Sequence, residues 1–187
     1  MKRTAALLFA LLVFLPVTAT WAQKVTIDYA HDFDFSGVKT FTYVDTPDSN
    51  ARNELDDARI RNAIIRQLEE RGLEQVESGG DIMVTYHVTT TENTTFDTTY
   101  YGYGGWGPGW GHWGGPAMAT SSTTSYTYID GTLIVDAYEP AEKKLVWHGS
   151  STVTVKDNPE KRSKQVDKIL DKMGKKWQKI LASKDKK

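Results

Sequence analysis

Residues 80–88 read GDIMVTYHV, and residues 131–138 read GTLIVDAY. In the first stretch, one face is formed by Ile82, Val84, Tyr86 and Val88, which alternate with Met83, Thr85 and His87. In the second, one face is formed by Leu133, Val135 and Ala137. Alternation with a period of two, in segments rich in β-branched and aromatic residues, is typical of strands with one buried face. These two stretches therefore predict the centre of a β-sheet.

Further strands are predicted on either side of this centre. They cover residues 25–29, 38–44 and 144–155, and the strand beginning at Ile82 is expected to continue to about Thr95. The strand that contains residues 131–138 and the strand at 144–155 are separated by the turn sequence EPAE at 139–142, which predicts a hairpin.

Two amphipathic helices are predicted by apolar residues at helical spacing. The first covers about 54–71, where Ile60, Ile64 and Leu68 recur and Leu55 lies one turn earlier. The second begins at the cap-and-proline pair Asn158-Pro159. Its apolar stripe consists of Val166, Ile169, Leu170, Met173, Trp177, Ile180 and Leu181.

The order of these elements predicts the fold class. Two amphipathic helices can cover one face of a sheet. We therefore expect a single α+β domain over residues 23–183. The architecture is a two-layer sandwich with a mixed, mostly antiparallel sheet of four to five strands. The helix between the second and third strands acts as a crossover, which predicts one parallel pair.

The amino terminus has the pattern of a secretory signal peptide. A positive start at Lys2 and Arg3 precedes an apolar run, and Thr20-Trp21-Ala22 predicts cleavage after Ala22. A retained membrane anchor is the alternative. The expected location is the periplasm, or association with the outer membrane. The chain has no cysteine, which excludes disulfides, thiol nucleophiles and a lipidated cysteine.

Charge is unevenly distributed along the chain. From Lys156 to the end there are twelve Lys/Arg and five Asp/Glu, which leaves a net charge of +7. Residues 23–155 hold nine Lys/Arg and nineteen Asp/Glu, a net charge of −10. This pattern indicates a basic surface helix beside an acidic body, or a helix that attracts anionic lipid or polymer. Export excludes nucleic acid as the expected partner. Residues 184–187 are expected to form a frayed basic tail.

Residues 100–116 read YYGYGGWGPGWGHWGGP, a glycine-rich insert that predicts a long loop at the tip of a β-hairpin. The loop has no charged residue and holds three of the six tryptophans. Such aromatic side chains favour a membrane interface, a sugar face or a protein groove. The candidate contact residues are Tyr101, Tyr103, Trp106, Trp110 and Trp113. The alternative interpretation is that the rings pack on the sheet or form a tolerated low-complexity expansion.

No catalytic or metal-binding motif occurs in the sequence. The histidines lack the close pairing typical of zinc ligands, and neither a phosphate-binding loop nor a nucleophile elbow is present. We therefore predict no cofactor and no metal site. His87, Asp136 and His148 lie on predicted strands, so an enzyme acting on an envelope polymer would use these groups. The ordinary interpretation of Asp136 is a hydrogen bond to a loop or to Lys144.

Four ordered segments resemble the bacterial domain-of-unknown-function family 4136. They are DFSGVKTF at 34–41, GDIMVTY at 80–86, GTLIVD at 131–136 and KLVWHGS at 144–150. The resemblance extends from about Val25 to Leu181. It implies an exported envelope protein with an α+β fold, and it supplies no catalytic residues. Many members are lipoproteins, from which this chain departs because it lacks a cysteine.

Together these observations predict an exported, non-enzymatic binding or assembly module of the cell envelope. The aromatic loop would contact an envelope protein, a membrane surface or a glycan. Self-association is a further alternative.

Overall fold

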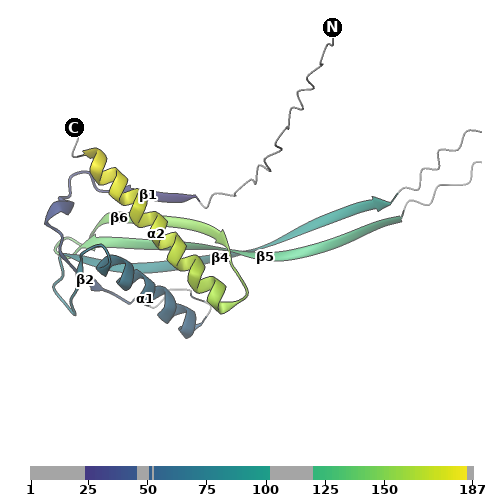
Figure 1. Ribbon diagram of the computed structural model, residues 1–187, viewed down its shortest axis with the longest axis horizontal. Helices are drawn as coiled ribbons and strands as arrows, with labels where there is room; N and C mark the ends of the chain where they lie inside the picture. Colours follow the sequence, from purple (N-terminus) through teal and green to yellow (C-terminus); the bar gives the residue numbers. More distant parts are fainter. Residues whose placement is uncertain (1–23, 46–50, 52, 102–119, 185–187) are drawn as a thin grey trace, which may run out of the picture.

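The computed structural model describes residues 24–45, 51, 53–101 and 120–184 (Figure 1). Its elements are β1 (Val25–Tyr29), the short 3-10 helix η1 (Phe35–Gly37), β2 (Thr40–Tyr43), α1 (Glu54–Glu69), β3 (Glu74–Gln75), β4 (Ile82–Tyr101), β5 (Thr120–Glu139), β6 (Lys144–Thr154) and α2 (Pro159–Lys184). The signal peptide predicted for residues 1–22 and most of the loop predicted for 100–116 lie outside the described residues.

The described strands form one six-stranded sheet in the order β1-β6-β5-β4-β2-β3. Neighbours from β1 to β4 are antiparallel, whereas β2 runs parallel to both β4 and β3. The mixed sheet and the crossover through α1 are thus confirmed. The predicted four to five strands were too few, because β3 contains only Glu74 and Gln75, both exposed, and has no apolar alternation.

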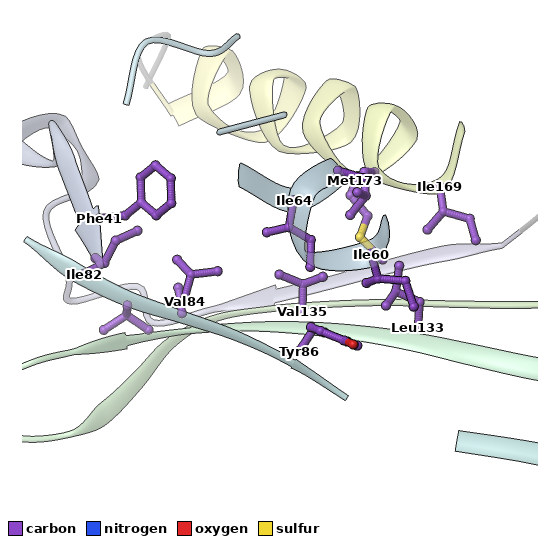
Figure 2. Close-up of a cluster of buried hydrophobic side chains, with 14 residues drawn as sticks. Phe41, Ile60, Ile64, Ile82, Val84, Tyr86, Leu133, Val135, Ile169 and Met173 are labelled. Carbon is purple, nitrogen blue, oxygen red and sulfur yellow. The ribbon is translucent and has the colours of Figure 1, made fainter. Parts of the chain in front are cut away.

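Both helices lie on the same side of the sheet, and the core fills the space between these two layers. Figure 2 shows Phe41, Ile64 and Val135 in this core. The predicted stripe of α2 contributes three buried members: Ile169, Leu170 and Met173. The two-layer α+β arrangement is therefore as predicted.

At the start of α1, the buried residue is not the one that the sequence predicted. Leu55, expected in the apolar stripe, is 67% exposed, whereas Asp56 is buried. The Asp56 carboxylate pairs with Arg59 at 2.7 Å and with Arg162 of α2 at 3.0 Å. Asn53 caps the helix by accepting a hydrogen bond from the Asp56 amide at 2.9 Å. This ion cluster joins the amino-terminal ends of the two helices.

The sequence Gly80-Asp81 fixes the parallel junction between β2 and β4. A Cβ atom at Gly80 would lie 2.6 Å from the Thr42 amide nitrogen, so only glycine allows this approach. Asp81 Oδ2 accepts hydrogen bonds from the amides of Lys39 and Thr40, at 2.9 and 2.8 Å. These bonds hold the pKa of the Asp81 carboxyl below its usual value.

The longest feature of the molecule is the hairpin of β4 and β5. The two strands pair without interruption from Met83↔Tyr138 to Tyr101↔Thr120. β2 pairs with β4 only as far as Val84, and β6 pairs with β5 only from Asp130. Beyond these limits the hairpin leaves the body as a two-stranded ribbon (Figure 1). We call residues 91–101 and 120–130 the hairpin arm.

Candidate functional sites: the hairpin arm, the open sheet face and the interlayer cavity

The hairpin arm is exposed along nearly its whole described length. Side chains with intermediate exposure occur only near its base, at Asn93, Ile129 and Asp130, among the arm residues whose side chains are described. Asp130 accepts hydrogen bonds from Asn93 at 3.1 Å and from Thr154 at 2.9 Å. Because Thr154 is the last residue of β6, these bonds fix the point at which the arm leaves the sheet.

Phe96, Tyr126 and Tyr128 are large aromatic residues of the arm whose side chains the structure describes. The exposed fractions of Phe96, Tyr126 and Tyr128 are 68%, 59% and 38%. Tyr126 and Tyr128 lie two residues apart on β5 and so share one face of the ribbon, opposite Thr95 and Asn93 of β4. Exposed aromatic rings so close together are typical of a contact surface.

The aromatic tip predicted to make contact lies largely outside the described residues. Four of the five candidate residues belong to the segment 102–119, namely Tyr103, Trp106, Trp110 and Trp113. The fifth, Tyr101, is the last residue of β4. The antiparallel pairing of β4 and β5 confirms that this segment connects the two strands of a long hairpin. Its role in contacts stays a prediction.

The open face of the sheet, opposite the helices, brings together two of the three polar residues considered for catalysis. Asp136 and His148 are cross-strand partners, and their Oδ1 and Nδ1 atoms lie 2.7 Å apart. The hypothesis that Asp136 bonds to a loop or to Lys144 is wrong, because its partner is His148 of β6 and Lys144 pairs with Asp32 at 2.7 Å. His87 lies opposite Ile134, one step further along the same face.

The Asp136–His148 pair lacks the surroundings of a typical active site. The cavity of about 230 Å³ beside His148 is lined by residues of β1 and β6 and their adjoining loops, and within the described part of the chain neither Asp136 nor His87 borders it. Among the described residues, no three His, Asp or Glu side chains gather in a way that would hold a metal ion. What the geometry provides is a contact at hydrogen-bond distance between a carboxylate and an imidazole on neighbouring strands.

A larger cavity, of about 360 Å³, lies between the sheet and the two helices, and we call it the interlayer cavity. Its walls are mainly apolar and include Leu68 of α1, Val135 of β5, and Leu170 and Met173 of α2. The volume of this cavity lies within the range usual for small-molecule sites, and mainly apolar walls are also usual for such sites.

Polar groups of the interlayer cavity are few and come from Arg71, Trp147 and two glutamines. The sequence analysis noted Trp147 only as part of the KLVWHGS segment and did not single out Arg71. An arginine directly before Gly72 resembles a cation that merely complements a helix carboxyl end, so no local signal distinguishes it.

Aromatic rings border one end of this cavity. The Trp177 ring of α2 lies 5.0 Å from Tyr29, 4.8 Å from Phe35 and 6.4 Å from Trp147, measured between ring centroids. All three contacts are edge-to-face, which is a favourable geometry for aromatic pairs. Phe33 and Phe35, in the loop before β2, both pack against the core. Lys184, predicted to fray, remains helical with its Nζ 4.3 Å from the centroid of the Tyr29 ring.

Neither described helix contains a stretch of sufficient length and hydropathy to traverse a bilayer. Comparison with solved structures finds a PDZ domain protein from Parabacteroides distasonis, with a TM-score of 0.48 and 12% identity. That match covers 79% of this chain and 34% of the other, so this chain spans about a third of that protein. A PelC dodecamer from Paraburkholderia phytofirmans matches with a TM-score of 0.46 and 8% identity, covering 80% of this chain and 92% of PelC.

No curated protein matches the chain. The family model described as "Domain of unknown function (DUF4136)" matches residues 25–176, which is most of the sequence. The resemblance noted from four short segments is thereby confirmed. The chain belongs to the DUF4136 family.

Proposed function

We propose that this protein is a non-enzymatic binding or assembly module of the cell envelope, and that the hairpin arm carries its contact surface. One observation supports this proposal above the others. A ribbon of two strands leaves the body with exposed side chains along both strands. Isolated two-stranded hairpins are marginally stable in water, so a ribbon of this length gains stability from a partner that covers it.

The edges of the arm suit a protein partner. Each strand of the ribbon uses one row of backbone groups for the other strand, and the second row faces outward. Lysine and proline, which natural proteins use to protect such edges, are absent from residues 91–101 and 120–130. A partner strand can therefore add to either edge, with Phe96, Tyr126 and Tyr128 supplying side-chain contacts.

The aromatic tip extends the same surface in sequence. Trp106, Trp110 and Trp113 are the proposed anchors, with Tyr101 and Tyr103 beside them. Buried aromatic side chains contribute much of the energy of protein interfaces. A membrane surface or a glycan would use the same rings differently, without pairing to the strand edges. The free edges favour a protein, either a different envelope component or a second copy of this chain.

The location in the envelope is part of the proposal. It is supported by the apolar leader and the cleavage pattern ending at Ala22. The lysines of α2 give the protein one strongly basic element, which would orient it toward an anionic surface. The enzyme alternative is supported by one contact only, the Asp136–His148 pair on the open sheet face.

Photocrosslinking in intact cells tests the proposed contact surface. A photoreactive amino acid is placed at Phe96, Tyr126 or Trp110. A matched control is placed at Leu55, which is as exposed as Phe96 but lies on α1. We expect the arm positions to yield discrete crosslinked species that the Leu55 position does not yield. Equal crosslinking from Leu55, or none from any arm position, would contradict the proposal.

Substitution of the tip tests its part separately. Replacing Trp106, Trp110 and Trp113 together with alanine should reduce the envelope-associated fraction in cell fractionation. The free energy of unfolding should stay unchanged, because side chains of the sheet and the two helices form the core of the described residues. Unchanged association of this variant would remove the tip from the proposal.

A further inference from the structure

The outer edge of β5 in the hairpin arm continues a hydrogen-bonded row that β6 begins. β6 pairs with β5 as far as Asp130, and the Ile129 carbonyl oxygen then accepts a hydrogen bond from the Val155 amide at 2.7 Å. In an antiparallel strand, the amide and carbonyl of one residue point to the same side, and the side alternates from residue to residue. The outward side is therefore also taken by the backbone groups of Thr127, Ser125, Thr123 and Ser121. Among the described strands, none pairs with these four residues on that side.

The β5 side of the arm lacks the charges that oppose pairing between identical strands. Residues 121–129 read SSTTSYTYI, without a charged residue or a proline. The arm part of β4 reads TENTTFDTT at 91–99 and carries Glu92 and Asp97. Pairing of identical strands brings equal charges near one another, and equal charges directly opposite are destabilising. An uncharged segment rich in threonine and tyrosine, which favour strands, is suited to pair with itself.

We propose that β5 of the arm pairs antiparallel with β5 of a second copy of this chain, across a two-fold axis at Thr124. This inference rests on the contact role proposed for the arm and names the partner. Thr127 then lies opposite Ser121 of the second copy. Ser125 lies opposite Thr123 of the second copy, so all four outward residues of each chain are paired. Such a two-fold interface uses the same surface on both subunits.

The shape of the arm fits this arrangement. At this register Tyr126, which is 59% exposed, lies opposite Ser122 of the second copy, so a large ring faces a small side chain. Because the arm leaves the body at one end (Figure 1), antiparallel pairing places the two bodies at opposite ends of a shared four-stranded sheet. Asp130, at the base of the arm, lies about 40 Å along this sheet from Asp130 of the second copy. The pairing therefore keeps the two bodies apart.

Analytical ultracentrifugation of protein purified from cells that express the full chain tests the partner. We expect the mass of a dimer. Thr124→Lys places two lysines directly opposite each other and should weaken dimerisation at least roughly tenfold. Thr99→Lys is the matched control, because Thr99 is equally classed as exposed and shares the arm face of Thr124, but lies on β4. A monomeric unmodified protein, or equal weakening by both lysines, would overturn the proposal.

Disulfide crosslinking tests the position of the axis. The chain has no cysteine, so a single introduced cysteine forms a disulfide only with a second copy. Thr124 points its backbone groups away from the shared edge and so faces itself in a non-hydrogen-bonded pair, with Cα atoms about 4.5 Å apart. This separation suits a disulfide. Thr124→Cys should therefore crosslink at least roughly tenfold faster than Thr99→Cys, whose cysteines lie on the two outer strands. Equal rates at both positions would overturn the proposed pairing.

Circular dichroism establishes that each variant is folded. If Thr124→Lys does not fold, the smaller change Thr124→Cys carries the test. Crosslinking in intact cells separates this inference from the proposed function. Arm positions that crosslink only to a different protein, together with a monomeric purified chain, would overturn pairing with a second copy and leave the contact role of the arm standing.

Discussion

Asp56 is the charged residue on which the junction of the two helices depends. Its side chain is 11% exposed and ion-paired to Arg162, which is 15% exposed. Replacing Asp56 with asparagine leaves a nearly buried arginine without its anion, so the free energy of unfolding should fall by about 3 kcal/mol. Urea denaturation measures the change. Arg59→Gln is the control and should cost about 0.5 kcal/mol, because Arg59 is 37% exposed. Equal losses in both variants would contradict a special role for the buried pair.

Asp81 gives the stability of the β2–β4 junction a dependence on pH. The amides of Lys39 and Thr40 lower the pKa of this carboxyl from its ordinary value of 3.8. A carboxyl whose pKa is lower in the folded state stabilises the protein above the unfolded pKa, and this contribution is lost as pH falls through the folded pKa. The stability difference between the unmodified protein and Asp81→Asn should therefore be full at pH 7 and shrink below pH 3.8. A difference that does not vary with pH would contradict this role.

Among the helices and strands, α2 is fixed to the edge of the sheet by Trp177. The Trp177→Ala substitution removes ring contacts with Tyr29, Phe35 and Trp147. It should lower the free energy of unfolding by about 3 kcal/mol. Lys179→Ala, two residues further along and exposed, should change it by less than about 0.5 kcal/mol. Chemical denaturation distinguishes these outcomes, and a small effect of Trp177→Ala would show that α2 is held elsewhere.

The elements differ in how far the sequence could reveal them. Alternation with a period of two predicted β4, β5 and β6, and helical spacing predicted α1 and α2, because each pattern reflects one buried face. β3 has no such face, since it is held by backbone bonds such as Glu74 N to Lys39 O, at 2.8 Å. The Asp136–His148 contact depends on strand register, including an irregularity between Ala137 and Tyr138. Register is a property of paired strands that no single segment displays.

For the molecule as a whole, the sequence predicted a hairpin tip but not the arm. The length of the arm depends on where β2 and β6 stop pairing with the central strands, at Val84 and Asp130. The interlayer cavity was likewise beyond sequence reasoning. Its lining comes from both helices and from the sheet, through residues far apart in the sequence such as Leu68, Val135 and Leu170.

Deleting the arm tests most directly whether it serves contact rather than folding. Residues 91–130 are replaced by Asn-Gly, which joins the paired residues Thr90 and Gly131 through a tight turn. The fraction of this variant that fractionates with the envelope is then compared with that of the full chain in the same cells. We predict that the shortened protein accumulates in folded form but is lost from the envelope fraction. Association equal to that of the full chain would contradict the account.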